Sequence, residues 1–262
     1  MDDDSRRSRG RRRAAAPTPP RPRRPRRRVS VVGVFGELLI TAGVLVLLFI
    51  GWQQWFNDLV VADEHRDQAS QLSEQFEQQA TAAPTEVPEG ADPPVTAAPA
   101  EAQTFANFYV PRFGADYAVP IAGGTSTVRT LNKIGIGHYD ETQMPGQVGN
   151  FGIAAHRTTY GAPFNKIADL QPGDKIYVQT QDGWYTYTFR NLQYVPATQV
   201  SVLQPVPDAP DVSAASGERL ITLTSCNPMF TAQERIVAYG VFDGWSPLTE
   251  VPAELAAAGV GA

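Results

Sequence analysis

The sequence predicts an all-β domain over residues 104–262, preceded by one membrane-spanning helix. From about Thr104 onward, short runs rich in β-branched and aromatic residues alternate with Gly, Pro and Asp turns, which is typical of strands. Before this region lies a single long apolar stretch. Six or more short strands with only short helices indicate a closed barrel or a sandwich.

The predicted strands recur along the whole domain. WYTYTF and TVRTL alternate with period two, while QPGDK and QDGW are turn signals between neighbouring runs. A short helix is expected near Pro163. A domain of this length can bury enough apolar surface to fold without disulfides. The strand-like runs are FANFYV, TVRTLNKIGI, FGIAA, KIYVQT, WYTYTFRNLQYV, RLITLTS and RIVAYGVF.

Residues 29–56 are predicted to form a transmembrane anchor. The stretch VSVVGVFGELLITAGVLVLLFIGW contains one charged residue, Glu37, and about 20 apolar residues suffice to span a bilayer as a helix. Trp52 ends the stretch, and Trp55 and Phe56 follow it, where a cleaved signal peptide would have small residues. We therefore expect the anchor to be retained, with its aromatic residues at the membrane interface.

The segments on either side of the anchor differ in charge. Residues 1–50 carry twelve Arg and four acidic residues, whereas residues 51–262 carry ten basic and 23 acidic residues. Residues 1–28 are rich in Arg and Pro and are expected to form a disordered tail, which the positive-inside rule places in the cytoplasm. Residues 104–262 then lie outside the cell, and their acidic balance argues against nucleic-acid binding.

Residues 57–103 are expected to form an extracellular tether. Their first part, residues 57–82, is polar and could extend the helix beyond the membrane. The second part, residues 83–100, is rich in Pro and Ala and lacks an apolar pattern. This composition is typical of a semi-extended linker.

Cys226 is the only cysteine, so a disulfide framework within the chain is excluded. It ends the run RLITLTSC, before Asn227 and Pro228 break the strand. A lone cysteine is more often a small buried apolar residue than a nucleophile. However, a thiol at a strand end faces a loop, where reactive groups are commonly displayed, and a free thiol outside the cell is prone to oxidation. Cys226 is therefore a candidate nucleophile.

Two histidines and one arginine are candidate partners of this thiol. His156 and His138 each follow a strand-like run, and a nearby base or cation activates a thiol. The spacing of these residues in the sequence does not decide which of the two histidines is the partner of Cys226. Arg235, nine residues after Cys226, can return on the next strand and donate to a substrate carbonyl or oxyanion, unless it is a solvated hairpin residue. No zinc motif or phosphate-binding loop is present in the sequence.

Three separated segments resemble the sortases, the cysteine transpeptidases of Gram-positive surfaces. TLTSCNP at 222–228 is similar to the family's Thr-Leu-x-Thr-Cys signature, and AAHRTTYGAPF at 154–164 is similar to the segment of its catalytic histidine. Arg235 matches the third conserved position. GHYDETQMPGQVGNFGIAAHR is similar to the class E housekeeping type of actinobacteria. The resemblance extends over about residues 104–246.

The resemblance implies an eight-stranded β-barrel with the active site at one end. It implies a catalytic triad of His156, Cys226 and Arg235, and it favours His156 over His138. Two positions depart from the family pattern: Ser225 stands where Thr is usual, and Ala155 stands where Gly usually precedes the histidine. The implied substrate-binding residues are His138, Tyr139, Tyr160, Thr224 and Ser225.

The resemblance also implies a reaction. Cys226 attacks the carbonyl between Thr and Gly of an LPXTG-like sorting signal, which for class E has an LAXTG-like form. The thioester then passes to an amine of a peptidoglycan precursor or of a pilin lysine, without a cofactor or metal. Two alternatives are a papain-like wall peptidase, which releases its product to water, and a non-catalytic wall-binding module with a buried Cys226.

Overall fold

The computed structural model describes residues 30–82, 92–209, 211 and 217–260. The expected cytoplasmic tail, residues 1–28, lies outside the described residues. Four single-turn helices, η1 to η4, accompany the longer elements. The longer elements are α1 (Val31–Ala82), β1 (Thr104–Tyr109), β2 (Ala118–Gly123), β3 (Ile136–His138), β4 (Gly149–Ala155), β5 (Lys175–Thr180), β6 (Gly183–Pro196), β7 (Arg219–Asn227), β8 (Glu234–Ser246) and α2 (Ala253–Ala257).

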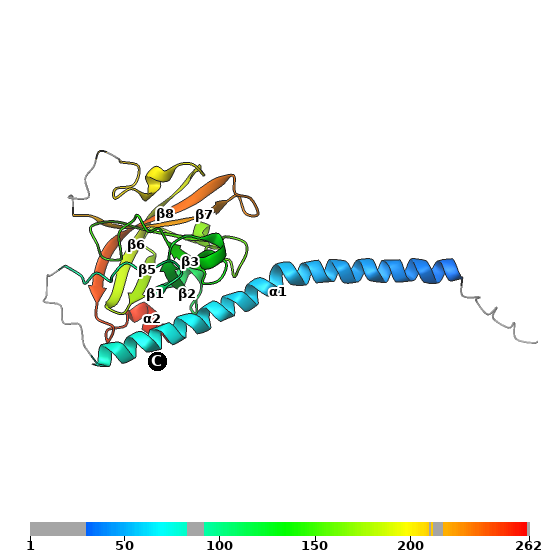
Figure 1. Cartoon of the computed structure of the whole chain (residues 1–262), viewed down its shortest axis with the longest axis horizontal. Coiled ribbons are helices and arrows are strands. Elements are labelled where there is room, and N and C mark those ends of the chain that lie inside the picture. The colour runs from blue at the N-terminus through cyan, green and yellow to red at the C-terminus, as the bar shows by residue number, and fades with distance from the viewer. Residues whose placement is uncertain (1–29, 83–91, 210, 212–216, 261–262) are drawn as a thin grey trace, which may run out of the picture. The chain divides into compact units, whose positions relative to one another are not determined.

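The eight strands form one closed barrel in the order β1-β2-β3-β4-β7-β8-β6-β5 (Figure 1). Pairing of β1 with β5 closes it. The pairs β2–β3 and β4–β7 are parallel, and the other neighbours are antiparallel. The predicted all-β fold and the implied eight-stranded barrel are confirmed, and the sandwich alternative is wrong.

The barrel interior is filled by apolar side chains from every wall. Alternate residues of a strand point to opposite faces, but β4 is buried along its whole length. The glycines and alanines of β4 have little or no side chain, so neighbouring segments can approach its backbone closely. Large core side chains that are fully buried include Phe108, Ile121, Phe151, Tyr185 and Ile221.

One predicted strand, TVRTLNKIGI, is wrong over most of its length. Thr127–Leu131 form η2, a π-helical turn, and only Ile136–His138 form a strand. Ser126 caps the turn by accepting a hydrogen bond from the backbone N–H three residues later, at 3.4 Å. Val128 is exposed and Thr130 is buried. Local capping therefore decides the conformation here, and the period-two pattern does not correspond to two faces of a sheet.

The chain divides into two compact units, Met1–Leu47 and Leu48–Ala262. Helix α1 begins in the first unit. Its segment Val31–Trp52 has a mean hydropathy of 2.4, is not buried against the rest of the protein, and is long enough to cross a membrane. Exposed apolar side chains on a helix of this length are suited to a lipid environment.

In the second unit, the later turns of α1 pack against the barrel. Ala69 and Phe76 are buried, and Leu72 lies against the same apolar cluster. Asn107 donates a hydrogen bond to the carbonyl of Ala69 at 2.8 Å, and Gln179 donates to the hydroxyl of Ser73 at 2.7 Å. The small and apolar residues recur every three or four positions and so form one face of the helix. This part of the expected tether is therefore a docked helix.

Replacing Phe76 with alanine is expected to lower the free energy of unfolding by about 3 kcal/mol, because the change leaves a cavity in a buried cluster. Urea unfolding of the full chain in detergent measures the effect. Gln75→Ala, at an exposed neighbouring position, should change stability by less than about 0.5 kcal/mol. Equal stabilities for the two variants would contradict the docking of α1.

The second part of the expected tether also contacts the barrel where the structure describes it. Thr96 donates a hydrogen bond to Asp182 at 2.7 Å, and the Tyr185 hydroxyl donates to the carbonyl of Pro94 at 2.7 Å. Glu101 forms an isolated bridge with Gly123 of β2. Proline has no backbone N–H, so a proline-rich segment has few backbone donors with which to pair its own carbonyls. A side chain of the barrel donates to one of these carbonyls instead. Residues 92–101 therefore follow the barrel surface.

Candidate active site

The ends of β4 and β7 bring His156 and Cys226 to the same edge of the barrel. The two strands are parallel, and Ala154 lies opposite Thr224. Parallel neighbours end at the same edge of a sheet. His156 comes two residues after Ala154 and Cys226 two residues after Thr224, so they occupy equivalent levels. Cys226 is partly exposed and free.

The next pairing adds Arg235 to this edge. Strand β8 runs antiparallel to β7, and Arg235 lies directly opposite Cys226. The Arg235 Nη1 donates hydrogen bonds to the carbonyls of Ala232 at 3.1 Å and Glu234 at 3.0 Å, in the connection between the strands. The guanidinium has five N–H donors, and the residue is only partly buried. The remaining donors are therefore accessible from solvent beside the thiol.

The imidazole of His156 is held from two sides. Its Nε2 lies 2.7 Å from Oδ1 of Asn132, so in this arrangement Nε2 carries a proton and Nδ1 is free to exchange one. The ring lies 5.2 Å from the Tyr160 ring, with 31° between their planes. Burial lowers the pKa of His156, and the nearby Asp58 carboxylate opposes that effect. A neutral imidazole is therefore favoured at neutral pH.

His138 is placed differently. Its side chain is 2 % exposed and lies between the rings of Phe105 and Phe151, at 5.9 and 5.1 Å. Its Nε2 lies 3.1 Å from the carbonyl of Gln143 and 3.1 Å from the Thr142 hydroxyl. Burial lowers the pKa of His138. The ring is therefore a hydrogen-bonded part of the barrel wall.

The other expected substrate-binding residues fall into two groups. Thr224 and Ser225 are buried, and their hydroxyls donate to the carbonyls of Ile153 at 3.3 Å and Ala155 at 2.8 Å. These bonds tie β7 to β4 directly before the two candidate catalytic residues. Tyr139 joins them through a hydroxyl contact to Thr224 at 2.9 Å. Tyr160 is 41 % exposed and is the member of the set most accessible to a ligand.

A model of the sortase domain matches residues 108–243, a stretch that contains His156, Cys226 and Arg235. The chain belongs to the sortase family. Two Streptomyces coelicolor sortases are similar to it. SrtE1 is 37 % identical over 78 % of this chain and 55 % of its own length, and SrtE2 is 33 % identical over 80 % of this chain and 81 % of its own length. The chain thus spans about half the length of SrtE1.

Solved sortases agree with this assignment. SrtA from Actinomyces oris has a TM-score of 0.59 and 34 % identity, over 63 % of this chain and 94 % of the other. Sortase E1 from Streptomyces coelicolor, solved with a tripeptide in its active site, has a TM-score of 0.54 and 38 % identity, over 60 % and 99 % of the two chains. The resemblance to class E sortases is confirmed.

Arg157, which contacts the backbone of Cys226, was not among the residues predicted for the site. The residue is 8 % exposed, and its Nη1 donates to the carbonyl of Cys226 at 3.5 Å and to Oδ1 of Asn227. Asn165 in turn donates to the carbonyl of Arg157 at 3.0 Å. Arg157 therefore ties the segment after β4 to the end of β7. Its position directly after His156 was the only available signal.

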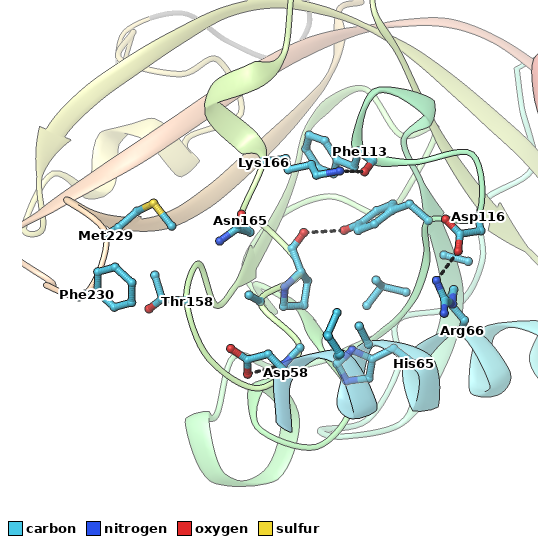
Figure 2. A pocket seen from close by; sticks show the side chains of 18 residues that line it. Asp58, His65, Arg66, Phe113, Asp116, Thr158, Asn165, Lys166, Met229 and Phe230 are labelled. Carbon is cyan, nitrogen blue, oxygen red and sulfur yellow. Dashed lines mark hydrogen bonds and ion pairs between the residues drawn. The ribbon is translucent and has the colours of Figure 1, made fainter. Parts of the chain in front are cut away.

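A cavity of about 560 Å³ lies beside the candidate site of this sortase. Helix α1 forms one wall through residues 58–66, and residues 158–166, which follow His156, form another (Figure 2). Met229 and Phe230, from the connection after Cys226, also contribute. The cavity is therefore bounded by the segments that follow both His156 and Cys226.

His65 of α1 lines this cavity together with the charged residues Asp58, Arg66, Asp116 and Lys166. Its side chain is 1 % exposed, and neither ring nitrogen has a hydrogen-bond partner among the described residues. Burial lowers the pKa of His65 to about 4. Since an unfolded histidine has a pKa near 6.5, the unfolded state binds the additional proton between these two pH values. The folded state therefore loses stability as the pH falls through this window.

Between pH 7 and pH 5, the wild-type chain is expected to lose about 2 kcal/mol more of its free energy of unfolding than His65→Leu does. Leucine fills similar space and takes up no proton. Urea unfolding of both proteins in detergent at the two pH values measures the difference. His138 and His156 remain in both proteins, so their contributions cancel. Parallel pH dependences in the two proteins would show that His65 is not buried as a neutral ring.

Proposed function

We propose that this sortase cleaves an LAXTG- or LPXTG-like sorting signal between Thr and Gly and transfers the new carboxyl end to an amine. The pairing of β4 with β7 and of β7 with β8, which brings His156, Cys226 and Arg235 together, is the observation that carries the proposal. A nucleophile, a proton carrier and a cation at one site are the groups that acyl transfer through a thioester requires.

In the first half of the reaction, the Cys226 sulfur attacks the carbonyl carbon of the Thr residue. Arg235 donates hydrogen bonds to the carbonyl oxygen as negative charge develops on it. The bond between Thr and Gly breaks, and His156, which has taken the thiol proton, gives it to the departing Gly amine. A thioester between Cys226 and the sorting signal remains.

In the second half, an acceptor amine attacks the thioester. His156 removes a proton from the amine as the new amide bond forms, and the carbon–sulfur bond breaks to regenerate Cys226. We infer that the acceptor is an amine of a peptidoglycan precursor or of a pilin lysine. Helix Val31–Trp52 anchors the enzyme in the membrane, with the Arg-rich residues 1–28 in the cytoplasm and residues 104–262 outside.

Mass spectrometry of reaction products tests this proposal. The full chain in detergent is mixed with LAXTG or LPXTG peptides and with glycine-type, diaminopimelate-type or lysine-type amines. We expect the Gly fragment to be released and the Thr carboxyl to be joined to an amine. Release of free acid alone, whatever amine is present, would support a papain-like peptidase instead. No turnover, together with thiol labelling of Cys226 only after unfolding, would support a wall-binding module.

A further inference from the structure

We propose that His65 is a positioning residue of this active site, a wedge from α1 that holds the two segments supporting the His156 ring. One segment carries Asn132, the hydrogen-bond partner of His156, and the other carries Tyr160, its stacking partner. The inference rests on the proposed function, because it assigns the wedge a role in the proton transfers of His156.

The first contact of the wedge is with the turn that follows Asn132. Gly135, three residues later, has φ +112°, and a Cβ atom there would lie 3.1 Å from Cε1 and 3.3 Å from Nε2 of His65. Such distances mean that the imidazole lies directly against the glycine backbone. The turn cannot move toward α1 while His65 fills this space, so the position of Asn132 is limited from that side.

The second contact is with the segment that follows His156. A Cβ atom on Gly161, whose φ is +76°, would lie 3.0 Å from Nδ1 of His65. Tyr160, the residue before it, adopts φ 53°, which is uncommon for a residue with a side chain. Asp58, about two helical turns before His65 on α1, accepts a hydrogen bond from the N–H of Gly161 at 3.3 Å (Figure 2). The helix thus holds this turn through two residues.

The chemistry of His65 is not explained by helix docking alone. Burying a polar group without a hydrogen bond costs about 1–3 kcal/mol, and neither nitrogen of His65 has a partner among the described residues. An apolar side chain would dock the helix without that cost. The flat ring, however, lies against the backbones of Gly135 and Gly161 at once, close enough that a Cβ atom on either glycine would be crowded. Its shape therefore serves the positions of the two turns.

Positioning predicts a particular kinetic effect. A displacement of about 1 Å in a catalytic group can lower turnover by as much as about a hundredfold. Neither Asn132 nor Tyr160 needs to move far for the His156 ring to lose its orientation. Loosening the wedge should therefore lower kcat, while the KM for the sorting peptide changes little.

The test compares His65→Ala with Phe76→Ala in the full chain in detergent. Both changes weaken the packing of α1, but Phe76 contacts the cluster around Trp184, away from the two turns. Steady-state rates are measured with an LAXTG peptide and hydroxylamine as acceptor, at a temperature where both variants are folded. We expect His65→Ala to lower kcat about tenfold with KM within about twofold, and Phe76→Ala to keep kcat within about twofold.

Should His65→Ala fail to fold, Asp58→Ala is compared with Asp58→Asn, because both remove the carboxylate charge that raises the pKa of His156, but only alanine removes the acceptor of the Gly161 N–H. The kcat of Asp58→Ala should fall below that of Asp58→Asn, with KM unchanged. The proposal is overturned if His65→Ala retains the wild-type kcat, if Asp58→Ala, tested in its place, has the kcat of Asp58→Asn, or if Phe76→Ala loses as much as His65→Ala. Inactivity of the wild-type enzyme toward every peptide and amine is a different result, because it would reject the proposed function itself.

Discussion

Replacing Cys226 with alanine is expected to abolish both formation of the thioester and transfer of the sorting peptide. The chain contains no second cysteine, so no other thiol can take its place. Loss of the covalent nucleophile from a catalytic triad lowers the turnover rate by at least about a thousandfold. Acid quenching followed by intact-protein mass spectrometry detects the acyl-enzyme, and product analysis measures the transfer.

The structure makes this variant a specific test. Cys226 is partly exposed at the end of β7, so removing its sulfur leaves the barrel core unchanged. The urea midpoint of Cys226→Ala should therefore match that of the wild type. Thr231→Ala, an exposed substitution in the connection that follows, serves as a matched control and should form the acyl-enzyme normally. Normal transfer by Cys226→Ala would rule out the proposed mechanism.

The two histidines of the barrel should respond to alanine substitution in opposite ways. His156→Ala is expected to lower turnover by about a hundredfold to ten-thousandfold, the usual contribution of a general acid or base. His138→Ala removes a buried ring from between Phe105 and Phe151, and it is expected to cost about 2 kcal/mol of stability while lowering turnover far less.

Parallel measurements of turnover and urea unfolding on the two variants separate these effects. For His156→Ala, the unfolding midpoint should stay close to that of the wild type, because the ring lies outside the apolar core cluster. His138→Ala should have nearly wild-type activity when it is assayed at a urea concentration well below its unfolding midpoint. Greater catalytic loss in His138→Ala than in His156→Ala would reverse the assignment.

The strand content was predictable from the sequence, but closure of the barrel was not. Alternating runs such as WYTYTF indicate strands through local periodicity. Closure depends on the pairing of β1 with β5, and the proximity of His156 to Cys226 depends on the parallel pairing of β4 with β7. The resemblance to sortases, rather than the spacing of residues, implied both features.

The residues that surround His156 could not be predicted, because their contacts join distant parts of the chain. Asn132 comes 24 residues before its partner and follows a segment that periodicity assigned to a strand. His65 lies in a polar stretch that composition alone assigns to a tether. Its role depends on Gly135 and Gly161, which are distant from it in the sequence and contact it in the folded structure. The two glycines appear in the sequence as ordinary turn residues.

The solitary thiol also determines how this enzyme responds to oxidants. Oxidation of Cys226 yields a sulfenic acid, which a neighbouring cysteine normally resolves by forming a disulfide. The chain has no such partner, and the thiol is accessible from solvent. Repair therefore depends on small thiols or reductases supplied from outside the protein, and without them further oxidation to the sulfinic acid is irreversible. The redox state of its surroundings thus sets the working lifetime of each molecule.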